Sequence, residues 1–193
     1  MRPGGEATRA RIIEAARAEF AQYGIAGARV DRIAANAKAN KAQLYAYFGN
    51  KDTLFDIVFE RSLEAIVGTV PVDGEDLPGY AVRLYDEYLA RPELIRLATW
   101  TRLERKPGGP LTEGPPPGHQ GKLDDIARAQ AAGFIDPSID PGEVLAMVIS
   151  MSMAWSPAST TFTATASDPE ADHERRRDLL RVLVGRAFAP EAA

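Results

Sequence analysis

The sequence predicts an all-α protein with about nine helices. Apolar residues recur every three or four positions through most of the chain, as in Ile12, Ala16 and Phe20, which is the spacing of one helix face. Helix-start signals recur as well: an N-cap and a first-turn proline at Asp140-Pro141 are followed by a capping-box acid at Glu143. Alternating apolar and polar residues never extend far enough for a sheet, so we expect helices alone.

The helices can be placed in order along the chain. Gly24 and Gly27 end the first, and Asn50 caps the fourth. The stretch 106–121 is a loop, because ten of its sixteen residues are Pro or Gly. The cap-and-proline pair recurs at Asp168, before the last helix. After the first helix, the expected ranges are about 30–37, 41–48, 51–69, 79–90, 92–105, 121–132, 142–155 and 169–188.

Charge is distributed unevenly along the 193 residues. Residues 1–55 hold 9 Lys or Arg and 5 Asp or Glu, a net charge of +4, whereas residues 56–193 hold 14 and 22, a net charge of −8. This asymmetry is typical of a small nucleic-acid-binding head on a different body, although chance surface charge also produces it. The chain contains no cysteine, which excludes disulfides and thiolate metal sites. Without a signal-peptide core or a membrane-length apolar run, we expect a cytoplasmic protein.

The second and third helices are short and joined by a tight turn, which is a helix-turn-helix pattern. At 100° per residue, Leu44 and Phe48 of the third helix face inward and two alanines lie opposite them. Tyr45 and Tyr47 lie on opposite flanks, about 200° apart, so both cannot enter one core, although half-buried tyrosines are common. A helix of this kind fits a major groove, with hydroxyls reaching phosphates on both sides. The predicted DNA contacts are Arg29, Val30, Asn40, Lys41, Ala42, Gln43, Tyr45, Tyr47 and Lys51.

Residues 9–55 carry a familiar motif series: "RIIEAARAEFAQYG", "VDRIAANA" and "LYAYFGNKDTLF". This series resembles the DNA-binding domain of the TetR/AcrR family of transcriptional regulators. The sequence departs from the family at the turn, where Lys38-Ala39-Asn40 replaces Gly-Val-Ser, and at Arg29, where a capping residue is common. Lys38 takes the glycine position, where a positive φ costs about 1 kcal/mol. The resemblance implies a DNA-binding domain at residues 1–50 and an effector-binding and dimerisation domain at residues 51–193.

Two helices near the C-terminus are strongly apolar. Residues 142–155 are hydrophobic on nearly every face, so one side faces the protein's own core and the other a partner. Residues 179–188 form a second apolar helix. The resemblance implies that these helices pair with their copies in a homodimer, and a thick monomer core is the alternative. The predicted interface residues are Val144, Val148, Leu180, Leu183, Val184 and Ala187.

The middle of the chain is rich in aromatic residues and methionine, and the family resemblance implies a pocket for a small effector there. Such side chains suit an apolar ligand, although stripes of this kind are more often plain core. The predicted ligand-binding residues are Tyr85, Tyr88, Trp100, Met147, Met151 and Trp155.

An enzyme is not expected. The histidines lack partners at metal-ligand spacing, no phosphate-binding loop or nucleophile elbow is present, and no cofactor is implied. The charge run at 172–178 is interpreted as a solvated helix face. The helix-turn-helix pattern predicts a DNA-binding protein, and the family resemblance implies a dimeric, ligand-responsive repressor that binds a palindromic double-stranded DNA operator and is released by a small, apolar effector. The alternative is a helical ligand-binding or protein-interaction module whose DNA binding has decayed.

Overall fold

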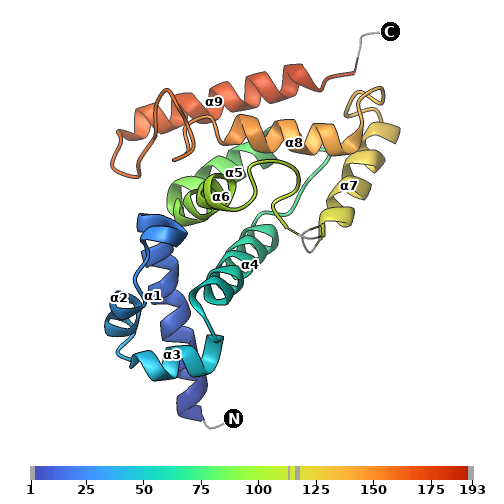
Figure 1. The fold of residues 1–193 in the computed structure, drawn as a ribbon. Helices are drawn as coiled ribbons and strands as arrows, with labels where there is room; N and C mark the ends of the chain where they lie inside the picture. The colour runs from blue at the N-terminus through green and yellow to red at the C-terminus, as the bar shows by residue number, and fades with distance from the viewer. Residues whose placement is uncertain (1–2, 113, 116–117, 191–193) are drawn as a thin grey trace. The chain divides into compact units, whose positions relative to one another are not determined.

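A computed structural model describes residues 3–112, 114–115 and 118–190. Within these residues the chain forms nine α-helices and no strand, which confirms the predicted all-α class (Figure 1). No helix of the described residues is both long and apolar enough to cross a membrane. The helices are α1 (Pro3–Gly27), α2 (Val30–Asn36), α3 (Lys41–Phe48), α4 (Lys51–Thr69), α5 (Leu77–Ala90), α6 (Glu93–Glu104), α7 (His119–Ala131), α8 (Pro141–Ser152) and α9 (Glu170–Ala187).

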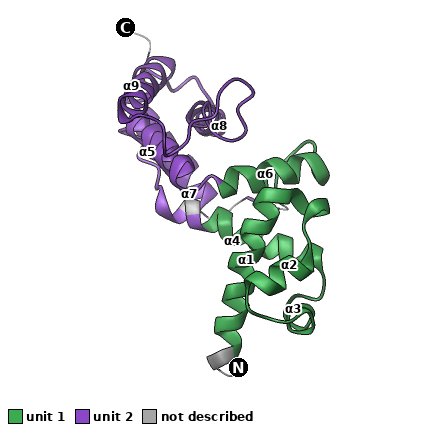
Figure 2. Ribbon diagram, turned by 90° about the vertical axis from the view of Figure 1, so that its left-hand side faces the viewer, with its two compact units in different colours: residues 1–64, 93–113 green, residues 65–92, 114–193 purple. Residues whose placement is uncertain are grey.

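The chain divides into two compact units (Figure 2). Unit 1 comprises residues 1–64 and 93–113, and unit 2 comprises residues 65–92 and 114–193. Unit 1 therefore contains α1, α2, α3, most of α4 and the whole of α6. Unit 2 contains α5, α7, α8 and α9, together with the last residues of α4.

The core of unit 1 is built from the apolar helix faces that the sequence predicts. Phe20 of α1 is fully buried, and its ring meets Phe55 of α4 edge-on at 5.1 Å between centroids. Leu44 and Phe48 of α3 are buried in the same unit, as expected from their phase on the helix. This packing holds α3 mainly by its inner face.

Gly24 interrupts α1 and is the one residue in it with non-helical angles, φ 72° and ψ −177°. A Cβ atom here would meet the side chain of Glu104 and lie 2.8 Å from the ring of Trp100, both on α6. The Glu104 carboxylate accepts hydrogen bonds from the N–H groups of Ile25 (3.2 Å) and Ala26 (2.8 Å). The break predicted at Gly24 thus becomes the point at which α6 is fastened to α1.

In unit 2, α5 buries a broad face that includes Tyr80, Tyr85 and Tyr88. Helix α8 starts as predicted, because the Asp140 side chain accepts from the second and third residues of the helix. The same expectation for Asp168 is wrong. Helix α9 begins with Pro169 as its N-cap, and the Asp168 carboxylate accepts instead from Thr165 and, at 2.9 Å, from Arg176.

Candidate nucleic-acid interface

The turn between α2 and α3 closes in spite of its lysine. Lys38 has a φ of 51° and is the one described non-glycine residue with positive φ, as expected from its place in the motif. The N–H of Lys38 donates to the carbonyl of Ala35, and the N–H of Ala39 donates to that of Ala34. This pattern is a Schellman motif, which normally contains glycine. Arg11 of α1 adds a 3.0 Å hydrogen bond to the carbonyl of Ala37.

Helix α2 receives its cap from α1. Arg29 stands at the N-cap, and its side chain makes no capping hydrogen bond. The carboxylate of Glu19, which is 4% exposed, accepts from the backbone N–H of Arg29 and from Nε of Arg32, each at 2.8 Å. Glu19 therefore replaces the missing local cap, a role that sequence reasoning missed because Glu19 lies ten residues away on another helix.

Helix α3 carries its own capping box. The Asn40 side chain accepts from the backbone N–H of Gln43 at 2.8 Å, and the side-chain Oε1 of Gln43 accepts from the backbone N–H of Asn40 at 3.1 Å. With Leu44 and Phe48 buried, the remaining face presents Lys41, Ala42, Gln43, Tyr45 and Ala46 to solvent.

All nine residues predicted to contact DNA belong to unit 1, and none is buried. Several have internal partners. The Lys41 ammonium lies 3.0 Å from the Asp31 carboxylate, whose hydrogen bond raises the pKa of Lys41. The Lys51 ammonium donates to the carbonyls of Ala26 and Ala28. The hydroxyl of half-buried Tyr47 lies close to α1 at Gly5, whereas Tyr45 is 42% exposed.

The six residues predicted to bind a ligand do not share one site. Tyr85, Met151 and Trp155 pack around Leu180, and the rings of Tyr85 and Trp155 meet edge-on at 5.9 Å. Tyr88 is buried in the same unit. Trp100 belongs to unit 1, where its indole N–H donates to the carbonyl of Ala21, and Met147 is 54% exposed on α8.

Polar groups inside unit 2 escaped sequence reasoning. His173 and Arg176 are buried. The expectation that the charge run at 172–178 forms a solvated helix face is therefore wrong at these two positions. Their spacing of three, continued by Leu180, is the signal that places them on an inner helix face. The Tyr85 hydroxyl lies 2.6 Å from His173 Nδ1, and Lys122 donates to the Tyr80 hydroxyl at 3.3 Å. Burial lowers the pKa of Lys122 and raises that of Tyr80 to about 12.

Four of the six predicted interface residues cannot meet a partner directly. Val144, Val148, Leu180 and Val184 are at most 2% exposed and line the interior of their own protomer. The physical reason is that a protomer's own core takes the most apolar stripe of each helix. Leu183 and Ala187 are exposed. The other large apolar side chains exposed on α8 and α9 are Met147, Leu179 and Val182.

A buried helix-turn-helix core with an outward-facing polar third helix defines a DNA-binding regulator. Residues 12–58 match the family model described as bacterial regulatory proteins, tetR family. Residues 76–186 match the model of the tetracyclin repressor-like C-terminal domain. The chain belongs to the TetR family of transcriptional regulators.

Two curated relatives and a solved structure match the chain to different extents. The HTH-type transcriptional repressor SCO4008 of Streptomyces coelicolor is 44% identical over 147 residues, which cover 76% of this chain and 77% of that protein. The HTH-type transcriptional repressor NicS of Pseudomonas putida is 31% identical over 106 residues, about half of each chain. The crystal structure of the regulator SCO4942 from Streptomyces coelicolor, 41% identical, superposes with a TM-score of 0.77 and covers 94% of this chain and 98% of its own.

Proposed function

We propose that this regulator is a repressor that binds a roughly palindromic operator as a homodimer and leaves it when a small, largely apolar effector binds unit 2. The observation that carries the proposal is the outer face of α3, which stays open to solvent while Leu44 and Phe48 anchor the helix from inside. The names of SCO4008 and NicS, both transcriptional repressors, favour repression over activation.

On DNA, the alanines of α3 form the apex that enters the major groove, because small side chains allow close approach. The Tyr45 hydroxyl and the Lys51 ammonium reach phosphates. Lys41 and Gln43 exchange their internal partners, Asp31 and the N–H of Asn40, for groups on DNA. A free Gln43 amide is suited to adenine.

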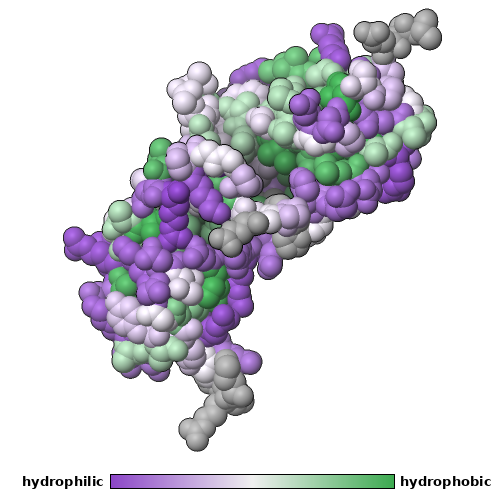
Figure 3. All heavy atoms as spheres, turned by 45° about the vertical axis from the view of Figure 1, so that its right-hand side comes forward, coloured by the Kyte–Doolittle hydropathy of each residue, from purple (hydrophilic) through white to green (hydrophobic). Residues whose placement is uncertain are grey.

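The dimer face comprises the exposed apolar residues of α8 and α9: Met147, Leu179, Val182, Leu183 and Ala187. Figure 3 shows exposed apolar side chains, in green, on the part of the chain that carries the C-terminus. Exposed apolar patches of this kind mark interaction surfaces.

The effector site lies among the buried tyrosines of α5, with Met151 and Trp155 beside them. Aromatic walls with few ionisable groups favour a small apolar ligand. Trp100 and Met147 are no longer part of the proposed site, since the first packs on α1 and the second is exposed on α8. We assign no catalytic residue and no cofactor, and the place of action is the cytoplasm, where bacterial DNA lies.

A titration followed by fluorescence anisotropy tests DNA binding. The probe is the protein's own upstream intergenic DNA, compared with a scrambled duplex at two salt concentrations. We expect selective, salt-sensitive binding by two protomers, or a multiple of two, per site. Equal weak binding to both duplexes, followed by no enrichment in a selection from random duplexes, would favour the alternative of a helical ligand-binding or interaction module.

Variants of the α3 face refine the test. Tyr45→Phe and Lys51→Ala should weaken binding to all sequences by roughly 1–3 kcal/mol, whereas Gln43→Ala should change sequence preference. Tyr23→Phe is the matched control, because Tyr23 is 41% exposed in the same unit but lies outside α3. An unchanged preference in Gln43→Ala would contradict the proposed groove geometry.

A further inference from the structure

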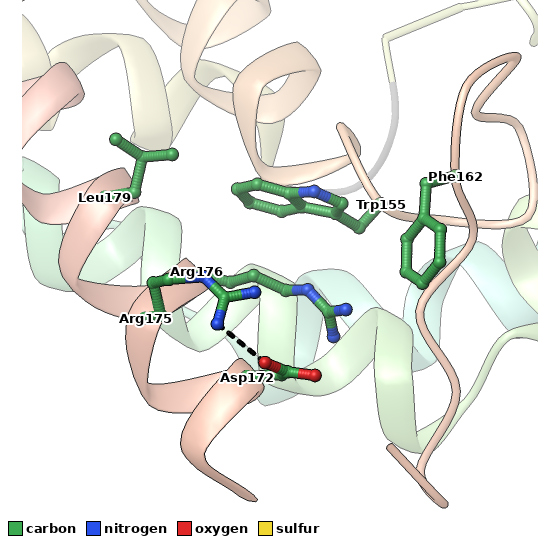
Figure 4. Close-up of a pocket in the computed structure, with 6 residues that line it drawn as sticks. All are labelled: Trp155, Phe162, Asp172, Arg175, Arg176 and Leu179. Carbon is green, nitrogen blue, oxygen red and sulfur yellow. Dashed lines mark hydrogen bonds and ion pairs between the residues drawn. The ribbon is translucent and has the colours of Figure 1, made fainter. Parts of the chain in front are cut away.

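A hollow of about 610 Å³ opens beside the N-terminal half of α9. Figure 4 shows Trp155 between Leu179 and Phe162, with the Arg176 guanidinium extending beneath toward Phe162. The charges at its edge are paired within the chain: Arg175 with Asp172 at 2.6 Å, and Arg176 with Asp168 at 2.9 Å. The hollow therefore offers an aromatic and aliphatic lining without an unpaired charge, which suits an apolar occupant.

The hollow continues into the exposed apolar face of α9. Leu179, at 44% exposure, lines the hollow and also begins a stripe that contains Val182 and Leu183. These positions lie on the flank of α9 next to its inner face, where Leu180 and Val184 are buried. The hollow is thus one end of the surface that we assign to the dimer.

A projecting side chain lies at the other end of α9. Phe134 is 51% exposed and follows Gly133, whose φ of 81° turns the chain after α7. Two residues later, the N–H of Asp136 donates to the carbonyl of Phe188 at 3.0 Å, which fastens this turn to the C-terminal end of α9. In Figure 1 the turn before α8 and the loop after α8 likewise lie at opposite ends of α9. The molecule therefore carries an apolar projection and an apolar hollow on one unit, separated along one helix.

We propose that, in the dimer, Phe134 of each copy fills the hollow beside Trp155 and Phe162 of the other. A two-fold interface pairs each surface with itself, so a projection must meet a hollow on the same surface. The hollow is centred near residue 176 of α9 and the projection is fastened at residue 188, which places the midpoint at residue 182. The two-fold axis then passes beside Val182 and Leu183, and the two α9 helices run antiparallel.

The opposite arrangement leaves the hollows empty. If the two α9 helices ran parallel, hollow would face hollow and the Phe134 rings would face each other. In the antiparallel arrangement, six residues on each side of the axis correspond to about 9 Å of helix, so each projection lies over the partner's hollow. This inference rests on the proposed homodimer and adds the register and direction of its contact.

Cysteine cross-linking tests the contact directly, because the natural chain contains no cysteine. Phe134→Cys and Phe162→Cys proteins carrying different affinity tags are mixed and treated with a short bis-maleimide. We expect a cross-linked heterodimer in the mixture and little product from either variant alone, since equivalent ends lie on the order of 18 Å apart along α9. Leu183→Cys alone should cross-link across the axis. Efficient product from Phe162→Cys alone, with none in the mixture, would overturn the antiparallel contact.

The strength of the dimer provides a second test. Phe134→Ala should raise the dimer dissociation constant at least about tenfold in sedimentation equilibrium, because it removes an aromatic anchor from the partner's hollow. Leu103→Ala is the control, since Leu103 is 70% exposed but belongs to unit 1. A monomeric wild-type chain would contradict the proposed dimer itself. A wild-type dimer that Phe134→Ala leaves unchanged would refute this contact alone.

Discussion

Unit 1 and unit 2 differ in how fully their buried polar atoms are hydrogen-bonded. In unit 1 the buried Glu19 carboxylate accepts from a backbone N–H and from Arg32. In unit 2 the Nε2 atom of buried His173 has no hydrogen-bond partner among the described residues. Lys122 has a pKa lowered by burial and donates to a tyrosine rather than to a carboxylate.

This difference matches the tasks that we assign to the two units. Satisfied internal hydrogen bonds fix a single arrangement, which is what a helix held in a DNA groove requires. A buried polar atom without a partner costs about 1–3 kcal/mol, and a bound ligand that supplies the partner recovers part of that cost. Unit 1 is therefore built to present a fixed surface, whereas unit 2 retains interior groups that an effector can satisfy.

Breaking the fastening between α1 and α6 should have the largest effect. Gly24→Ala places a Cβ against Trp100 and requires a backbone conformation that is essentially restricted to glycine, so we expect a loss of at least about 3 kcal/mol in the free energy of unfolding. Urea denaturation measures the change. Gly27→Ala is the control: its Cβ meets only Tyr23 at an ordinary 3.4 Å, and it should be neutral or stabilising. Equal losses in both variants would show that the contact with α6 is unimportant.

Unit 2 should respond to alkaline pH. Burial raises the pKa of Tyr80 from 10.0 to about 12, and burial together with neighbouring Tyr80 raises the pKa of Tyr88 further. Stability from these phenols is complete below pH 10 and is lost as pH rises through about 12, because only the unfolded chain ionises them readily. For Tyr80 the loss is at most about 3 kcal/mol. Denaturation across this pH range should show a shallower decline in Tyr80→Phe and Tyr88→Phe than in the wild type.

Substitution of Glu19 tests how much the hydrogen bonds of a buried carboxylate stabilise unit 1. Glu19→Gln weakens a buried acceptor for the N–H of Arg29, and we expect a loss of about 2 kcal/mol in the free energy of unfolding. Glu14→Gln is the matched control, since Glu14 is exposed and pairs with Arg17 on the surface. If both substitutions cost the same, Glu19 does not act as the cap of α2.

The units also differ in how much the sequence predicts. The phase of α3 was predictable, because the positions of Leu44 and Phe48 follow from helix periodicity within eight residues. The Asn40 cap was predictable for the same local reason. The role of Glu19 depends on contacts between separate helices, which periodicity does not specify.

In unit 2 the predicted interface had the wrong helix phase at four positions, such as Val144 and Leu180. Periodicity shows that a stripe is apolar but not whether it faces the protomer's own core or a second copy. Phe134 stood outside every predicted helix, so no periodic pattern drew attention to it. The family resemblance supplied the expectation of a dimer but not the residues that form it.

The smallest expected effect has the opposite sign and concerns the turn of the helix-turn-helix. Lys38 adopts a left-handed φ of 51°, which costs a residue with a Cβ about 1 kcal/mol, so Lys38→Gly should raise the free energy of unfolding by up to that amount. Ala35→Gly in α2 is the control, because glycine within a helix should cost a similar amount. The lysine is exposed beside α3, and losing its charge should weaken DNA binding and lower its salt dependence. A turn that gains stability while DNA binding weakens would indicate that Lys38 is kept for its charge at the expense of backbone strain. A gain in stability with unchanged salt dependence would show that the Lys38 charge does not contribute to DNA binding.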